Sequence, residues 1–480
     1  MPEKDKLNHS EINTELDPIT SLIAEFSDPD IQEEEFRNDF FQGLSGRRKK
    51  AAFALSLIWL VTILLHLVSW SFWIVLALGI FVTIQALRLM FVSPSVNNQA
   101  LSTQENVNLP RMSLMVSAKN EEMVVRKLVK MLLSFDYPQE LYEFWVINDN
   151  SSDGTGRILD ELAQKHPQLK VLHRDNTAKG GKSGALNQAF ALTNGDIIGV
   201  FDADAKASPD LLRKIVPLFE VENIGAIQVR KSMSNADENF WTQGQLSEMA
   251  LDSYFQQQRI ACGGMGELRG NGQFVRRLPL NSCGGWNEET ITDDLDLTIR
   301  LHLDNWDINI LEHPPVEEEG VKKAIALWHQ RSRWAEGGYQ RYFDYWRFIF
   351  SNRLNWHKKF DLLYFFLVQY IFPTAAIPDL VMVITRHHIP LIAPLTSLTL
   401  VLAFWGMFTG LKRTKSDTFL SITDNLKMIQ QSILGMIYLT HWFIVMPVTT
   451  ARMSIRQKQL KWVKTVHDGS SDNLELGLTE

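Results

Sequence analysis

The chain contains little cysteine and has no excess of positive charge. Only two of its 480 residues are cysteines, Cys262 and Cys283, and they match neither a metal-binding spacing nor a disulfide framework. The formal net charge of −7 argues against a general nucleic-acid binder. No internal repeat is visible. The chain is too long for one ordinary soluble domain, and its cysteine usage is simplest to explain with a catalytic region that faces the cytosol.

Apolar residues, 45% of the chain, are spread unevenly along it. Residues 51–68 and 72–92 are each long enough to cross a bilayer, which takes roughly 20 residues, so we predict a transmembrane hairpin over residues 47–95. Residues 1–46 are acidic and polar, which predicts a mostly disordered region and argues against a cleaved signal peptide. Because Arg47-Arg48-Lys49-Lys50 directly precedes the hairpin, the positive-inside rule places the domain after it in the cytoplasm.

Three further apolar runs lie at about 362–383, 389–410 and 428–448, within a predicted membrane region of residues 361–450. The chain is therefore expected to be a multi-pass integral membrane protein. Three crossings after the middle domain would put the polar, basic tail of residues 451–480 outside, whereas the positive-inside rule prefers it inside. One of the three runs is therefore expected to be re-entrant or interfacial, and the sequence leaves open which.

The middle of the chain, residues 110–335, alternates strand and helix patterns. Strands are expected at residues 112–117, 144–147, 171–173 and 197–201, and helices at 121–134, 153–165, 183–192 and 208–219. This order predicts an α/β domain with a doubly wound, mostly parallel sheet. In such sheets ligands bind beyond the carboxyl ends of the strands, and the motifs around Asp149 and Asp202 fall at such ends.

Three polar turns have both a structural and a functional interpretation. Asp149 lies in a turn of Asn, Asp and Ser residues, which either caps a helix or lets Asp149 accept a nucleobase N–H. Lys182 lies in a glycine-rich basic turn, which is either a flexible surface loop or a phosphate site; Walker spacing is absent. Asn271 lies in a glycine-containing turn that either permits close approach of a ligand to the backbone or simply reverses the chain.

Two acidic motifs are candidates for metal and proton chemistry. Asp202 and Asp204 end the most apolar strand, and two carboxylates at this spacing can share Mg²⁺ or Mn²⁺, which favour oxygen ligands and diphosphate. Short acidic pairs also end many strands that bind nothing. Asp293 and Asp294 open a predicted helix, where they either complement the helix dipole or supply a general base for an attacking hydroxyl.

A third motif, Gln330-Arg331-Ser332-Arg333-Trp334, lies close to the first C-terminal apolar run. If Gln330 starts a helix, Arg333 and Trp334 lie on the same face as Gln330, where an amide, a guanidinium and an indole can close over a diphosphate or hold a sugar ring. Residues 336–360 are rich in aromatic and basic side chains. This composition predicts an amphipathic helix in the membrane interface, with an ordinary packing helix as the alternative.

In their joint order and spacing, these motifs resemble membrane-bound family 2 glycosyltransferases, which include cellulose, hyaluronan and poly-N-acetylglucosamine synthases. The resemblance covers residues 112–345 and implies a GT-A fold and inverting transfer of a sugar from a UDP-sugar with the help of Mg²⁺ or Mn²⁺. It assigns nucleotide-sugar contacts to Ala118, Asn120, Glu121, Asp149, Lys182, Asp202, Asp204 and Asn271, metal binding to Asp202 and Asp204, and catalytic roles to Asp294, Arg333, Gln330 and Trp334.

Within that resemblance, Arg333 is expected to act on the leaving diphosphate, and Gln330 and Trp334 at the acceptor end. Two residues depart from the family pattern. Asn148 stands where the family has an aspartate, and Asp293 stands where it has a glutamate. We take Asp294, rather than Asp293, as the base.

The family resemblance is compatible with two kinds of acceptor. The Q-x-x-R-W motif is often associated with processive polysaccharide synthases, whereas the modest membrane part most resembles the β-monoglucosyldiacylglycerol synthases of photosynthetic bacteria. We therefore expect transfer of glucose from UDP-glucose to 1,2-diacylglycerol, a membrane lipid. The alternatives are a processive β-polysaccharide synthase and a non-catalytic membrane scaffold, and the intact set of charged site residues argues against the scaffold.

Overall fold

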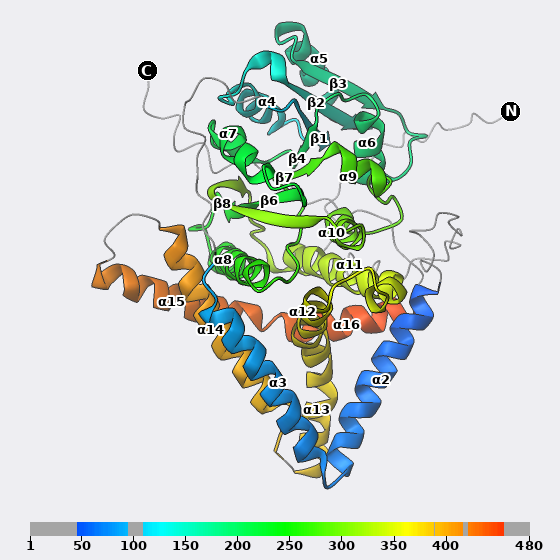
Figure 1. The fold of residues 1–480 in the computed structure, drawn as a ribbon, viewed down its shortest axis with the longest axis vertical. Helices are drawn as coiled ribbons and strands as arrows, with labels where there is room; N and C mark the ends of the chain where they lie inside the picture. The colour runs from blue at the N-terminus through cyan, green and yellow to red at the C-terminus, as the bar shows by residue number, and fades with distance from the viewer. Residues whose placement is uncertain (1–45, 95–108, 388, 416–420, 456–480) are drawn as a thin grey trace, which may run out of the picture.

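The computed structural model describes residues 46–94, 109–387, 389–415 and 421–455. An α/β domain lies at one end of the molecule, and long helices converge toward a point at the other end (Figure 1). The predicted disordered region at residues 1–46 and the predicted tail at 451–480 lie almost entirely outside the described residues.

The α/β domain is built on one eight-stranded sheet with the order β3-β2-β1-β4-β7-β6-β8-β5. The strands are β1 (Met112–Ala118), β2 (Tyr142–Asp149), β3 (Leu169–Arg174), β4 (Ile197–Phe201), β5 (Lys206–Ala207), β6 (Ile224–Met233), β7 (Gln273–Arg276) and β8 (Asp307–Glu318). The half formed by β3, β2, β1 and β4 is parallel, as the alternating pattern predicted. β7 runs antiparallel to both of its neighbours, so the sheet as a whole is mixed.

Helices cover both faces of this sheet. They are α4 (Val125–Leu133), α5 (Thr155–Lys165), α6 (Gly181–Phe190), α7 (Leu211–Ile215), α8 (Phe240–Ala261), α9 (Arg277–Ser282), α10 (Asp293–Leu303) and α11 (Ala324–Phe350). Apolar residues of α4, α5 and α7 pack in one core, and those of α6, α9 and α10 pack in a second core on the other face. Successive side chains of a strand point to opposite faces of the sheet, and here both faces carry apolar residues that helices must cover. The predicted doubly wound fold class is confirmed.

The remaining helices are long and apolar. They are α2 (Arg47–Leu67), α3 (Ser71–Phe91), α12 (Trp356–Phe366), α13 (Phe372–Arg386), α14 (Ala393–Thr414), α15 (Ile422–Leu439) and α16 (Trp442–Ile455), and a π-helical turn, Leu367–Ile371, joins α12 to α13. Within the described residues, five stretches have the length and composition to cross a membrane: α2, α3, α12–α13, α14 and α15–α16.

Four of these five stretches touch the α/β domain through the part nearer one end and extend away from it at the other. α2 begins there, where Arg47 Nε donates to Asp344 Oδ1 of α11 at 2.9 Å. α3 ends there, since Gln258 Nε2 of α8 donates to the Val92 carbonyl at 3.0 Å. The α12–α13 stretch begins shortly after α11 and contacts it as far as Thr374, whose hydroxyl forms a hydrogen bond with that of Tyr339 at 2.9 Å. α14 ends there, because Arg413 Nη2 donates to Gln258 Oε1 at 3.2 Å. The far ends of these helices converge in Figure 1.

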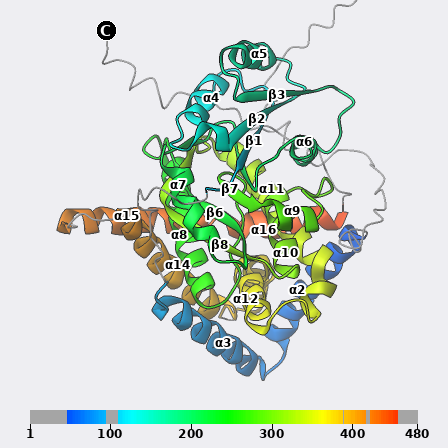
Figure 2. The ribbon, with the colours of Figure 1, turned by 45° about the horizontal axis from the view of Figure 1, so that its top comes forward.

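The fifth stretch, α15–α16, follows the α/β domain along its length instead. Gln431 of α15 donates to the Gln243 carbonyl of α8 at 2.8 Å, and Arg452 near the end of α16 contacts Glu336 of α11 at 3.3 Å. These residues are separated by roughly 30 Å of helix, which equals the thickness of a bilayer core. Figures 1 and 2 both show α15 and α16 running sideways beneath the domain.

The segment from 336 to 360 is not a separate interface helix. Residues 336–350 are the second half of α11, and α12 starts at Trp356 after a short break. Most of the α11 half is buried between the α/β domain and the other helices, with Trp346, Arg347 and Phe350 as exposed exceptions. An aromatic and basic composition suits a buried helix with paired arginines as well as a surface one, so composition alone did not show that this segment is divided between α11 and α12.

Candidate active site

The turns after β1 and β2 are tied to each other. Ala118 is the buried last residue of β1, and Asn120 takes the left-handed conformation with φ 55°, which asparagine tolerates. The Asn120 backbone N–H donates to Ser151 Oγ at 2.9 Å, and the Glu121 N–H donates to Thr155 Oγ1 at 2.8 Å. The predicted nucleotide-contacting turn and the turn after Asp149 therefore form one surface.

Asp149 has a buried partner that the sequence did not point out. Asp149 Oδ1 accepts from Arg174 Nη1 at 2.6 Å, and the same nitrogen donates to the Gly181 carbonyl at 2.9 Å. The arginine therefore joins the end of β2 to the loop that carries Lys182. Arg174 also lines a cavity of about 580 Å³ together with Lys179 and other residues of that loop. Its place at the end of β3, next to β2, was the signal that could have found it.

Lys182 and Asp202 form an ion pair, with Nζ and Oδ1 separated by 2.5 Å. Asp202 follows β4, and its backbone N–H donates to Asn271 Oδ1 at 3.1 Å. The Asn271 amide in turn donates to Glu318 Oε2 at 3.3 Å, and the residue is fully buried. Asn271, predicted as a ligand contact, is placed so that it holds the backbone of Asp202.

Asp202 and Asp204 offer oxygen ligands of the kind that Mg²⁺ and Mn²⁺ prefer. The side chain of Asp202 is 37% exposed, and Asp204 Oδ2 accepts from the Glu319 backbone N–H at 2.9 Å. The described part of the chain has no group of three or more His, Cys, Asp or Glu residues that could hold a metal. The pair therefore fits a cation that takes its remaining ligands from a diphosphate and water.

Asp294 lies in the first turn of α10 beside Asp293. Burial, together with the like charge of Asp293, raises the pKa of Asp294 to about 6. The Leu295 N–H donates to Asp294 Oδ1 at 2.8 Å. Asp293 Oδ2 is buried and has no hydrogen-bond partner among the described residues. A carboxylate whose pKa lies near neutrality is suited to accept a proton at physiological pH.

Two cations share the electrostatic environment of these carboxylates. Burial lowers the pKa of Arg333, and the charges of Asp202, Asp294 and Asp293 act in the opposite direction. Burial also disfavours the charged form of Lys182, but Asp202 and Asp293 raise its pKa overall. The structure thus brings five charged residues from β4, α6, α10 and α11 into one place, and we call them the site cluster: Lys182, Asp202, Asp293, Asp294 and Arg333.

The start of α10 is seated directly on α11. A Cβ atom added to Gly337 would lie 2.1 Å from Thr292 Oγ1, so only glycine leaves room for this packing. Gly337 is one turn after Arg333, and Thr292 directly precedes Asp293 and Asp294. The contact therefore sets how close the carboxylates of α10 come to the arginine of α11.

The remaining motif residues lie on α11, which begins at Ala324, before Gln330. Arg331 Nη1 donates to Gln330 Oε1 at 3.2 Å, and its guanidinium lies 3.9 Å from the ring centroid of Trp334. Lys231 Nζ lies 5.9 Å from the same ring. The sequence motif gives Arg331 no role of its own. In the structure Arg331 is fully buried and contacts two other residues of the motif, Gln330 and Trp334.

Comparisons with known proteins identify the family. The model of the family "Glycosyltransferase like family 2" matches residues 110–337. The chain is 55% identical over 467 residues to a β-monoglucosyldiacylglycerol synthase of Synechocystis, covering 97% of this chain and 98% of the relative. The chain belongs to glycosyltransferase family 2. It is also 53% identical to a β-monoglucosyldiacylglycerol synthase of Trichormus variabilis, over 95% of this chain and 97% of the relative.

The fold of this family 2 glycosyltransferase agrees with a solved structure. A mannosyltransferase from Pyrobaculum calidifontis, in complex with GDP-Man and Mn²⁺, superimposes with a TM-score of 0.52 at 20% identity, covering 81% of this chain and 98% of that one. The predicted GT-A fold and the predicted family membership are confirmed.

Proposed function

We propose that this glycosyltransferase transfers glucose from UDP-glucose to 1,2-diacylglycerol, with inversion, to give β-monoglucosyldiacylglycerol. The names of its 53–55% identical relatives support this acceptor and product. The single observation that carries the chemistry is the partly buried Asp294, whose pKa is raised to about 6 beside Lys182 and Arg333. One proton acceptor and two countercharges are the groups that a single displacement at a sugar carbon requires.

In the proposed reaction, Asp294 accepts the proton of the diacylglycerol hydroxyl while that oxygen attacks C1 of glucose. The new C1–O bond forms as the bond from C1 to the diphosphate oxygen breaks, and the electron pair leaves with UDP. General-base help of this kind typically contributes about 10²–10⁴-fold. The proximity of Asp293 supports this role, because it keeps the pKa of Asp294 high enough for the carboxylate to hold the proton.

The cations of the site cluster are assigned to the leaving diphosphate. Lys182 and Arg333 face the carboxylates across the site, and a departing UDP would take over that countercharge. Mg²⁺ or Mn²⁺ held by Asp202 and Asp204 would supply further positive charge to the diphosphate. Asp149, held by Arg174 at 2.6 Å, is assigned to the nucleobase end of the donor.

A lipid acceptor requires the site to lie at the membrane surface. We take the four stretches that extend away from the domain at one end, α2, α3, α12–α13 and α14, as the membrane crossings. Their contacts with the domain alternate between start and end, as four successive crossings demand. The α15–α16 stretch does not cross, because it touches the domain from Gln431 to Arg452.

The exposed side of α15 supports a position in the membrane surface. Its exposed large apolar residues are Ile422, Leu426, Ile429, Ile433 and Ile437, which recur at three- and four-residue spacing along one face. The opposite face packs on α8 through Gln431. A helix of this kind lies in the headgroup region with its apolar face toward the acyl chains.

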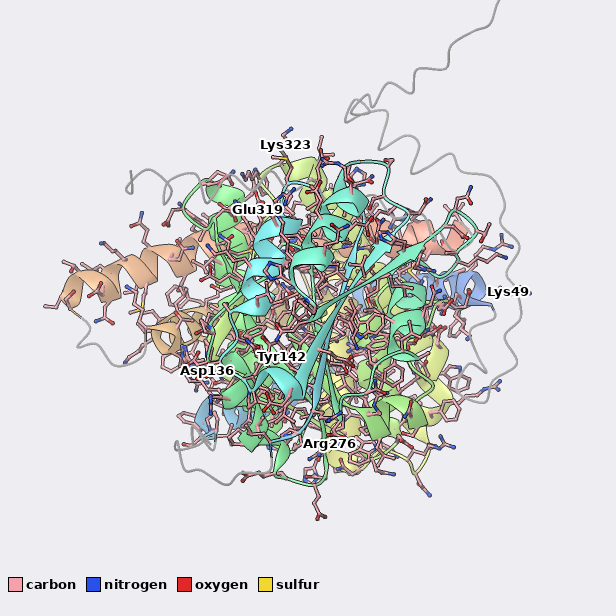
Figure 3. All side chains as sticks on the ribbon, turned by 90° about the horizontal axis from the view of Figure 1, so that it is seen from above. Lys49, Asp136, Tyr142, Arg276, Glu319 and Lys323 are labelled. Atoms are coloured by element: carbon pink, nitrogen blue, oxygen red, sulfur yellow. The ribbon has the colours of Figure 1, made fainter. Side chains whose placement is uncertain are left out.

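This arrangement puts the catalytic domain and the end of α16 on the same side of the membrane. The basic run Arg47–Lys50 marks that side as the cytoplasm. Figure 3 shows the domain from above. Exposed Lys49, at the start of α2, lies at one edge of the molecule in this view. Glu319 and Lys323 lie at another edge, just before α11. The conflict between three C-terminal crossings and a basic tail is thereby removed.

The function is tested with purified protein in mixed micelles, given radiolabelled UDP-glucose and diacylglycerol. Label is expected in the lipid extract, in a single glucosylated product. Label found only in long, ethanol-insoluble polymer would refute the lipid acceptor. EDTA is expected to abolish the transfer and added Mg²⁺ or Mn²⁺ to restore it, and activity that persists in EDTA would remove the metal from the proposal.

A further inference from the structure

A polar cluster joins four helices on the membrane-facing side of the site. Arg331 Nη2 of α11 donates to Glu248 Oε2 of α8 and to the hydroxyl of Tyr438 of α15, the latter at 3.0 Å. Trp442 Nε1 of α16 donates to Glu248 Oε1 at 2.9 Å. Both oxygens of one carboxylate are therefore in use, and we call the four residues the Glu248 clamp.

The clamp is buried and closely packed. The side chains of Arg331 and Glu248 are 0% and 14% exposed. Tyr438 is equally enclosed, because a Cβ atom added to Gly244 of α8 would lie 2.3 Å from its ring. A buried guanidinium that loses its carboxylate partner is left with an uncompensated charge. Glu248 is therefore the group on which the place of Arg331 depends.

Arg331 connects the Glu248 clamp to Trp334 at the acceptor end of the site. Its guanidinium lies 3.9 Å from the ring centroid of Trp334, a distance at which cation and ring attract each other. Trp334 itself is only partly buried, so its indole still presents surface to a ligand. An indole stacked on a fixed guanidinium has little freedom to rotate.

The clamp also includes the junction of the two surface-lying helices. Tyr438 is in the last turn of α15 and Trp442 is the first residue of α16. Glu248 thus holds this junction beside Trp334. A lipid that reaches the site along α15 would meet the indole at this point.

We propose that Glu248 is a positioning residue for the lipid acceptor. Through Arg331 it orients the indole of Trp334, and through Tyr438 and Trp442 it fastens the α15–α16 junction next to that indole. This inference rests on the proposed function, because it takes the acceptor to be a lipid that enters from the membrane.

The test is the variant Glu248→Gln, with KM measured separately for each substrate. In mixed micelles of varied diacylglycerol mole fraction, at saturating UDP-glucose, the acceptor KM is expected to rise about tenfold, as for the loss of one charged hydrogen bond. The donor KM is expected to change less than about twofold, because the Glu248 carboxylate contacts Arg331, Tyr438 and Trp442, which lie outside the site cluster. An equal rise in both constants, or no rise in the acceptor KM, would overturn the proposal.

Two further variants make the test independent of folding. Trp442→Phe removes one hydrogen bond to Glu248 and keeps the ring, so it is expected to raise the acceptor KM in the same direction by a smaller factor; an unchanged acceptor KM in a folded Trp442→Phe protein counts against the proposal. Gln431→Ala breaks the bonds between α15 and α8 outside the clamp and is expected to leave both constants unchanged. Wild-type protein that glucosylates no diacylglycerol would instead refute the proposed function.

Discussion

Two of the charged groups in the described residues differ in how their charges are matched. In the first, Glu267 accepts from three arginines, Arg259, Arg269 and Arg341, at 3.1, 2.5 and 3.0 Å. Arg259 also binds Asp361 of α12 at 2.8 Å. We call these five residues the Glu267 network. The second group is the site cluster, in which three carboxylates share two cations.

The pKa values of one carboxylate in each group shift in opposite directions. Burial alone would raise the pKa of Glu267, but Arg341 and Arg259 outweigh it and hold the pKa well below the usual range. Asp294 is partly buried, and its pKa rises to about 6, because the strongest influence after burial is the like charge of Asp293. Matched partners make a carboxylate inert and stabilising, whereas a like-charged neighbour makes it reactive.

The largest effect is expected from Asp294→Asn, which removes the proposed base of the site cluster and leaves the Glu267 network unchanged. Turnover should fall by about 10²–10⁴-fold, because the acceptor hydroxyl loses its base. The thermal midpoint should not fall, since the variant removes a partly buried charge that has a like-charged neighbour. Initial rates with radiolabelled UDP-glucose measure the first quantity, and wild-type turnover in a folded Asp294→Asn protein would refute the assignment.

Glu267→Ala should do the reverse and act on stability. Removal of the shared partner takes the carboxylate from buried Arg341, whereas Arg259 and Arg269 keep Asp361 and Asp252. Breaking such a buried pair costs about 3–5 kcal/mol of unfolding free energy. Denaturant titration of the detergent-solubilised protein measures this loss. The matched control is Glu161→Ala, which breaks ion pairs of half-exposed residues and is expected to leave the midpoint unchanged. Equal stability of the two variants would contradict the proposed contrast.

Gly337→Ala is expected to disturb the spacing between the two groups, because α11 carries Arg333 before Gly337 and Arg341 after it. The added Cβ atom would push Thr292 away, and kcat/KM should fall by about 10- to 100-fold, as for a displacement of about 1 Å. Gly79→Ala in α3 is the control, since its Cβ atom would meet Leu395 at an ordinary 3.6 Å. Unchanged kcat/KM in Gly337→Ala would show that this contact does not set the site geometry.

The smallest effect concerns pH. With a pKa of about 6 for Asp294, kcat/KM should fall as pH drops below 6, to about a tenth of its plateau at pH 5. Asp293→Asn removes the like charge, lowers the pKa of Asp294 and should move this inflection to lower pH. The pH profiles of wild type and variant measure the shift. An inflection that moves to higher pH in the variant would show that Asp293 is not the charge that raises the pKa.

Local patterns in the sequence were sufficient for the parallel half of the sheet and for most of the site cluster. Strands β1 to β4 and the helices after them follow from apolar periodicity and polar turns, and parallel strands bring their carboxyl ends to one edge. Asp202, which follows β4, and Lys182, in the first turn of α6, lie 2.5 Å apart at this edge. Asp294 and Arg333 were chosen by resemblance, and their roles remain predictions.

Only the tertiary structure decided which partners these residues have and which apolar helices lie along the α/β domain. Arg174 reaches Asp149, and Glu248 reaches Arg331 across 83 residues of chain; no local pattern reports such pairs, because they depend on how distant elements pack. The mean hydropathy of α14 equals that of α15–α16, because hydropathy measures the composition of a helix and not its direction in space. That α15 and α16 lie along the domain follows from their hydrogen bonds to α8 and α11.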